Sequence, residues 1–277
     1  MRREKETKLL RMSLRQAAKE RKSALVVYIL LRALVIVSLV LQIFNRNYEN
    51  VFLCSLTLIF FTIPMFLEQK LRIEIPDVLE ILIYLFIYAA AILGEMNSFY
   101  VRFPFWDTML HTINGFLAAA IGLSLVGLLN QSEKILFKLS PFFLAITAFC
   151  FSMTIGVLWE FFEFFMDQVF HTDMQKDFVV NNIYTVALDA THTNRVVAIP
   201  HITSVTINGK DLGLGGYLDI GLIDTMKDLI VNFIGAATFS FFGYYYFKRK
   251  EKGKFLNSFL LYSVADRKGE EQGKTEQ

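Results

Sequence analysis

Six long apolar blocks constrain the fold of this chain more than any other feature of its sequence. A helix that crosses the hydrocarbon core of a bilayer needs about 20 mostly apolar residues, and lipid-exposed irregular backbone is not tolerated there. With 54% hydrophobic residues and a mean hydropathy of +0.43, we predict an all-α multi-pass membrane protein with six transmembrane helices in a bundle. The blocks lie at roughly 24–44, 51–67, 78–96, 107–129, 141–166 and 219–247, and we expect the second, the shortest, to need flanking polar residues to reach the interface.

The distribution of basic residues predicts how the chain is oriented. The first 22 residues carry nine Lys/Arg, and the stretch after Phe247 opens "KRKEKGK". Cytoplasmic segments are enriched in Lys and Arg, so we expect both termini in the cytoplasm and the connector 167–218 outside. The predicted organisation is a basic cytoplasmic segment 1–23, a transmembrane domain 24–247 and a cytoplasmic polar tail 248–277.

The basic start is read as an uncleaved anchor, because the apolar run after it has spanning length and no small-residue cleavage pattern follows. For the protein as a whole we expect the lipid bilayer, and no nucleic acid, as a partner. Cys54 and Cys150 both lie inside predicted spans, so they indicate neither a disulfide framework nor a cysteine zinc site.

The long external connector is predicted to form a small β-rich insertion. The stretches "NIYTVALDA", "RVVAIPHI" and "SVTINGKDL" have the β-branched, alternating character of strands. Asn208-Gly209, inside the last of them, is a strong signal for a hairpin turn.

Polar side chains recur near the outer ends of the last three predicted spans. They occur in "WDTMLHTINGF", "GVLWEFFEFFMD" and "DIGLIDTMKDLIVNFIGA" at spacings of three and four residues, which place each set on one helical face. Counting a rise of about 1.5 Å per residue, the three sets fall into layers. These are an outermost layer of Asp107, Asp167 and Asp224, a second of His111, Glu163 and Asp228, and a third of Asn114, Glu160 and Asn232.

The charge balance of these layers predicts a bound cation. Six carboxylates face at most one imidazolium and Lys227, which the helical period points partly away from Asp228. Such a cluster cannot stay ionised and unpaired in a low-dielectric environment, so some carboxylates are protonated or a cation fills the site. Carboxylate, imidazole and amide oxygens suit Zn²⁺, Mn²⁺ or Mg²⁺. The predicted metal ligands are Asp107, His111, Asp228, Asp224 and Asp167, with Glu160 and Glu163 as catalytic residues and Asn114, Asn232 and Lys227 in substrate or structural roles.

A structural interpretation of the same residues stays open. Asp107 and Asp224 lie at predicted helix starts, where carboxylates are favoured by capping and the helix dipole. The cluster could also be interhelical polar glue. The deeper residues argue for a functional site, because ionisable side chains inside a membrane are expensive and commonly functional.

Stretches in the last three predicted spans resemble two groups of known membrane proteins. "DLIVNFIGAATFSFFG" resembles the D-x-x-x-N-x-x-G-A motif in the last helix of VanZ-like proteins, which are associated with resistance to a glycopeptide antibiotic. "WDTMLHTINGF", "WEFFEFFMD" and "DTMKDLIVNFIGA" more closely resemble the YjdF-like bacterial inner-membrane family, whose function is unknown. The resemblance covers about half the chain and implies a bacterial cell membrane. The motif positions that it implies are His111, Glu160, Glu163, Asp228 and Asn232.

Three functions remain open at this point. The first is a metal-dependent enzyme at the outer leaflet that acts on a lipid or lipid-linked cell-envelope precursor, with Glu160 or Glu163 as general base. The second is a non-catalytic envelope or regulatory protein with a structural polar cluster. The third, a proton- or cation-coupled transporter, is disfavoured because the inner halves of the last three spans carry no charges and no inverted repeat is visible.

Overall fold

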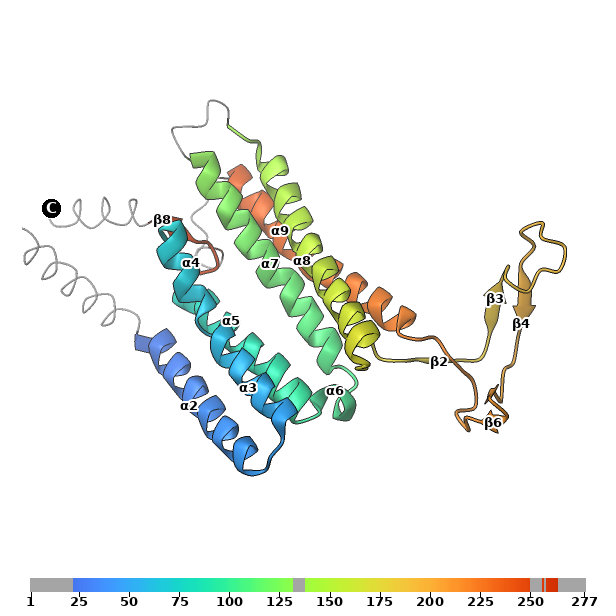
Figure 1. Cartoon of the computed structure of the whole chain (residues 1–277). Coiled ribbons are helices and arrows are strands. Elements are labelled where there is room, and N and C mark those ends of the chain that lie inside the picture. Colours follow the sequence, from blue (N-terminus) through green and yellow to red (C-terminus); the bar gives the residue numbers. More distant parts are fainter. Residues whose placement is uncertain (1–21, 132–137, 250–255, 257, 264–277) are drawn as a thin grey trace, which may run out of the picture. The chain divides into compact units, whose positions relative to one another are not determined.

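The computed structural model describes residues 22–131, 138–249, 256 and 258–263 (Figure 1). Within these residues, six helices are long and apolar enough to cross a membrane. The prediction of a six-span helical membrane protein is therefore confirmed, while most of the predicted segment 1–23 lies outside the described residues. The six helical segments are Ser23–Phe44, Tyr48–Leu71, Asp77–Met96, Trp106–Asn130, Pro141–Phe170 and Leu222–Arg249.

The described residues divide into two compact units. The first contains residues up to Thr154 and those from Val231 onwards, and the second contains Ile155–Ile230. Both boundaries fall inside continuous helices, α8 (Pro141–Phe170) and α9 (Leu222–Arg249). The other helices belong to the first unit and are α2 (Lys22–Phe44), α3 (Tyr48–Phe60), α4 (Ile63–Leu71), α5 (Asp77–Tyr88), the π-helix η1 (Ala89–Met96), α6 (Phe99–Arg102) and α7 (Trp106–Gln131).

The second span is longer than the sequence suggested. The apolar block 51–67 becomes α3 and α4, which together reach from Tyr48 to Leu71 with a break at Phe61 and Thr62. Pro64 lies in the first turn of α4, where its missing N–H would have no helical partner anyway. The proline therefore starts a second helix instead of ending the span. The prediction of a short second span was wrong, because the two helices together have spanning length.

One apolar core joins α2, α3 and the α5–η1 helix. The rings of Tyr28, Phe61 and Tyr84 contact one another, with centroids 5.1–6.4 Å apart. Cys54 is fully buried beside them, Cys150 is exposed, and both are free thiols.

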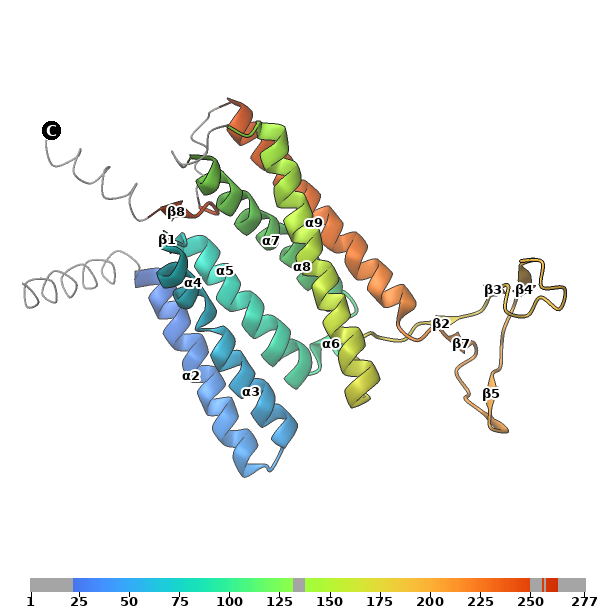
Figure 2. The same ribbon diagram turned by 45° about the horizontal axis from the view of Figure 1, so that its top comes forward.

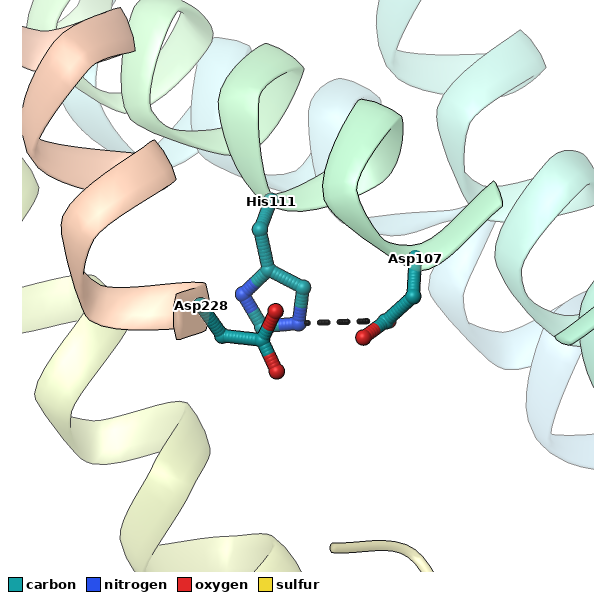
Figure 3. Close-up of side chains that lie close together, drawn as sticks. All are labelled: Asp107, His111 and Asp228. Carbon is teal, nitrogen blue, oxygen red and sulfur yellow. Dashed lines mark ion pairs between the residues drawn. The ribbon is translucent and has the colours of Figure 1, made fainter. Parts of the chain in front are cut away.

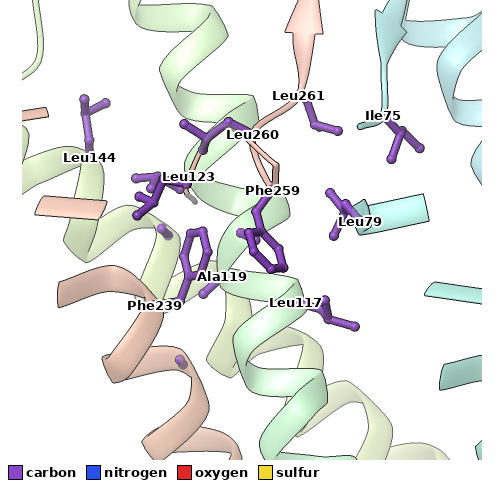
Figure 4. Packing of buried hydrophobic residues seen from close by; sticks show 14 of the residues in the cluster. Ile75, Leu79, Leu117, Ala119, Leu123, Leu144, Phe239, Phe259, Leu260 and Leu261 are labelled. Atoms are coloured by element: carbon purple, nitrogen blue, oxygen red, sulfur yellow. The ribbon is translucent and has the colours of Figure 1, made fainter. Parts of the chain in front are cut away.

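A second core lies around α7 (Figure 4). Small residues on α7 and α8 leave room for larger ones, and the buried members include Leu117, Ala119, Ala120, Leu123, Leu144, Ala148, Ala236 and Phe239. Leu256 and Phe259–Leu261 belong to the same cluster, although they come from the predicted polar tail. Next to them, β8 (Tyr262–Ser263) pairs antiparallel with β1 (Ile73–Glu74), as Figure 2 shows.

Helices α7 and α9 approach closely at two glycines of the first unit. A Cβ atom added to Gly115 would lie 2.9 Å from the carbonyl carbon of Asn232, and one added to Gly235 would lie 2.9 Å from the amide nitrogen of Phe116. Further along, Gly127 lies near Phe247. The contacts advance in the same direction on both helices, so α7 and α9 run parallel, with backbones touching at small residues as in many membrane helix pairs.

The second unit contains three short antiparallel strand pairs. They are β2 (Val179–Val180) with β7 (Tyr217–Leu218), β3 (Ile183–Thr185) with β4 (Val197–Ile199), and β5 (Thr206–Ile207) with β6 (Lys210–Asp211). The predicted turn at Asn208-Gly209 is present, with φ of 52° and 80° as a type I′ turn needs. The strands are shorter than the predicted stretches, because most of their side chains are exposed and no core extends them.

The last span starts at Leu222, three residues later than predicted. Asp219 accepts hydrogen bonds from the amides of Phe178 and Ile223, both at 2.7 Å. Ile220 and Gly221 have φ of 58° and 79°, which breaks the helical conformation. Asp219 therefore ties the start of α9 to the connector instead of lying inside the helix.

The carboxylate of Asp189 organises a loop of the connector 167–218, and we expect its protonation to loosen this loop. The Thr191 hydroxyl, then the amides of Arg195, Thr191 and Thr193, donate to its carboxylate and lower its pKa from 3.8 to about 2. A depressed folded-state pKa stabilises the loop above about pH 4 and ceases to do so as the pH falls towards 2. We expect exchange protection of these amides, corrected for intrinsic rates, to fall over that range.

Hydrogen–deuterium exchange with mass spectrometry measures this protection. The Asp189→Asn variant is the control, because its protection should not vary with pH between about 5 and 2. Protection in the native chain that stays constant over the same range would contradict the role given to the Asp189 carboxylate.

Candidate metal centre

The first turns of α7 present an aspartate and a histidine on one face. His111 Nε2 lies 3.5 Å from Asp107 Oδ1, one helical turn away. The His111 side chain is 8% exposed and that of Asp107 is 29% exposed. The imidazole is therefore buried, whereas the carboxylate keeps partial access to its surroundings.

One turn further along α7, an amide layer connects three helices within the first unit. Asn114 Nδ2 donates to Asn232 Oδ1 at 3.1 Å, and Asn232 Nδ2 donates to the Ser152 carbonyl at 3.5 Å. Ser152 Oγ donates to the carbonyl of Gly115 at 2.7 Å. Since a backbone carbonyl can only accept, these contacts fix the orientation of both amides and turn the Asn114 oxygen away from Asn232.

The residue of α8 in this amide layer is Ser152, whereas the sequence assigned Glu160 to that level. Glu160 lies eight residues, about 12 Å, further along α8. The helix continues to Phe170, about one turn past the predicted end near residue 166, so the late end explains about half of this eight-residue difference in depth. The asparagine pair, in contrast, does meet at one level.

The third element of the site comes from α9. Asp228 is 3% exposed and lies one turn before Asn232 on the same helix face. One ligand atom each from Asp107, His111 and Asp228 lies within 4.8 Å of the other two, as the side chains in Figure 3 show. Three of the five predicted metal ligands are thus brought together.

The other two predicted ligands, Asp167 and Asp224, are not in this group. Asp167 accepts three hydrogen bonds of 2.7–2.8 Å from residues 172–175. Asp224 Oδ2 accepts one of 2.7 Å from the amide of Lys176. These contacts hold the chain that follows α8 and occupy both carboxylates in a loop-capping role, which the helix dipole also favours for Asp224 at the start of α9.

The predicted catalytic glutamates are buried in the C-terminal half of α8. Glu160 is 4% and Glu163 8% exposed, and Trp159 Nε1 donates to Glu163 Oε1 at 2.9 Å. Lys227 turns to the aromatic ring of Phe178, with Nζ 3.5 Å from its centroid. Catalytic roles for the two glutamates remain predictions.

Sequence reasoning missed three polar residues of this region. Ser152 lies two turns before Glu160 on the same face, but a single hydroxyl in an apolar run is a weak signal. Trp159 is four residues before its partner Glu163. Trp106 precedes Asp107, and its buried indole N–H has no hydrogen-bond partner among the described residues.

Comparison with known proteins places the chain in a family. No curated protein and no solved structure matches it. A family model described as "Predicted membrane protein (DUF2238)" matches residues 26–249, about four fifths of the chain. This match spans all six membrane helices and every residue of the candidate site. The chain belongs to the DUF2238 family of predicted membrane proteins, which is the YjdF-like family.

Proposed function

We propose that this membrane protein binds a divalent cation through Asp107, His111 and Asp228. The observation that carries the proposal is the convergence of two carboxylates and an imidazole within 4.8 Å. Imidazole favours Zn²⁺ and carboxylates suit Mn²⁺, whereas Mg²⁺ is usually held by oxygen ligands alone. We therefore place Zn²⁺ and Mn²⁺ ahead of Mg²⁺.

The register of α7 and α9 supports the same grouping independently. Asn114 contacts Asn232 within the first unit, and the two helices run parallel through their glycine contacts. Moving back one turn on each helix leads from Asn114 to His111 and from Asn232 to Asp228. Parallel helices keep their register over one turn, so these two side chains are expected at the same level.

Charge gives a physical reason for a cation. Asp107, His111 and Asp228 all lie on spanning helices, and His111 and Asp228 are buried. Carboxylates gathered on spanning helices bring negative charge into a low-dielectric region, where burying an ion costs several kcal/mol. A divalent cation at this position would offset that charge.

The geometry requires only a small adjustment. Ligand atoms bound to one ion at about 2.1 Å stand at most about 4.2 Å apart. The present separations of up to 4.8 Å exceed that limit slightly, and side-chain rotation can close the difference. The Asn114 oxygen, which faces away from Asn232, is available as a further ligand on the same face of α7.

We further propose a role in cell-envelope chemistry at the outer leaflet. The outward orientation rests on the charge bias of the connectors, and the substrate class is a lipid or lipid-linked envelope precursor. A cation at this site would polarise a phosphoryl or carbonyl oxygen, with Glu160 or Glu163 taking a proton from the attacking group. The pattern shared with VanZ-like proteins adds no reaction to this proposal.

The matched variants Asp228→Asn and Asp224→Asn test the cation site. Both lie on α9 one turn apart, but only Asp228 belongs to the convergent group. Removing one ligand charge should weaken Mn²⁺ binding by at least about tenfold in Asp228→Asn and leave it unchanged in Asp224→Asn. Titration of detergent-purified protein, followed by Mn²⁺ paramagnetic resonance, measures the affinity. Equal affinities in both variants and the native chain would overturn the site.

A further inference from the structure

After its last span the chain contributes side chains to the apolar cluster around α7. Leu256, Phe259, Leu260 and Leu261 are each 6–8% exposed and belong to the apolar cluster around α7. We call Leu256 together with residues 258–263 the C-terminal segment. A stretch this short cannot span a bilayer, and its apolar side chains are instead placed among helices of the first unit.

Backbone contacts fix this segment on two sides. β8 pairs with β1 in the register Ile73 to Ser263 and Glu74 to Tyr262. The amide of Leu261 donates to Ser124 Oγ at 3.1 Å, and that hydroxyl, 3% exposed, donates in turn to the carbonyl of Ala120. These hydrogen bonds pair some of the backbone polar groups that the segment buries. Pairing lowers the cost of placing such groups in an apolar core.

The tip of the segment reaches the centre of α7 (Figure 4). The Phe259 ring lies 5.4 Å from that of Phe116 and 6.1 Å from that of Phe239, and these two rings are 4.8 Å apart. Phe116 directly follows Gly115, whose carbonyl belongs to the amide layer. The three rings therefore lie beyond the amide layer of Asn114 and Asn232, on the side away from His111.

We infer that the C-terminal segment is a plug that seals the bundle between the amide layer and the Gln131 end of α7. The three rings and the four buried residues of the segment fill the space that would otherwise expose Ser124 and the underside of the amide layer. Among the described residues, the plug then closes the polar face of α7 on the Gln131 side. Passage across the protein along this face requires the plug to leave.

A single reporter cysteine tests the plug. The chain carries Ser124→Cys with Cys54 and Cys150 replaced by serine, and an impermeant maleimide is added to the membrane side that holds the C-terminus. We expect the full chain to react at least about tenfold more slowly than a detergent-denatured sample. Phe259→Asp, which places a charge among the rings, should raise the rate at least about tenfold, because a carboxylate is not tolerated there.

Truncation supplies the matched controls. Removing residues 264–277 leaves the C-terminal segment intact and should leave the reporter thiol protected, whereas removing residues 256–277 should expose it. Fast labelling of the full chain overturns the plug whatever the variants do, and so does protection that persists in Phe259→Asp or in the longer truncation. Because the readout needs no cation, it stands apart from the test of the metal site.

Discussion

Gly235→Ala is expected to lower the free energy of unfolding by about 1–3 kcal/mol or more, the range for overpacking a tight interface. The added methyl would overlap the carbonyl oxygen of Thr112 and lie 2.9 Å from the amide nitrogen of Phe116. Both atoms belong to the α7 backbone, so no side chain can rotate to make room. The helices must separate, and the hydrogen bond between Asn114 and Asn232 would lengthen with them.

The matched control is Gly127→Ala, on the same α7–α9 interface. Its methyl would lie 3.3 Å from Cζ of Phe247, the far end of a side chain that can shift. Thermal unfolding of detergent-purified protein measures both variants against the native chain. We expect a large loss of stability in Gly235→Ala and little change in Gly127→Ala. Equal stability of the two would contradict the close backbone contact.

His111→Ala should abolish the stabilisation that a cation gives the native chain. A ligand at 100 times its Kd adds about 2.7 kcal/mol to the free energy of unfolding if it binds only the folded state. We expect Zn²⁺ or Mn²⁺ to raise the unfolding temperature of the native chain accordingly. The variant lacks the only imidazole of the site and should show no such rise.

His171→Ala provides the control for this second effect. His171 follows α8 and is exposed, outside the convergent group. It should keep the full cation-dependent rise in unfolding temperature. A rise that is lost in both variants, or kept in both, would show that the cation acts elsewhere on the protein.

The six spans could be predicted because apolar length is a strong signal for membrane helices. Their ends could not, since local contacts decide them. Asp219 turns the chain before Leu222, and Pro64 starts a new helix inside the second span. The C-terminal segment was also missed, because so short a stretch gives no signal of a span and its strand partner, β1, is far away in the sequence.

The candidate site was predictable where helical spacing alone sets the geometry. Asp107 and His111 share a face of α7, and the spacing of Asp228 and Asn232 predicts the same for α9. Asp167 and Asp224 were assigned as ligands, but the loop that they hold cannot be derived from periodicity. The role of Ser152 could not be predicted, because its contact with Asn232 depends on how α8 packs and on where that helix ends.

Elemental analysis of detergent-purified protein tests the central claim most directly. The native chain, loaded with Zn²⁺ or Mn²⁺ and then dialysed, should hold close to one metal ion per chain. His111→Ala and Asp228→Ala should lose the ion while still eluting as folded protein in size-exclusion chromatography. A native chain that retains no metal after loading with Zn²⁺, Mn²⁺ and Mg²⁺ in turn would contradict a cation site at Asp107, His111 and Asp228.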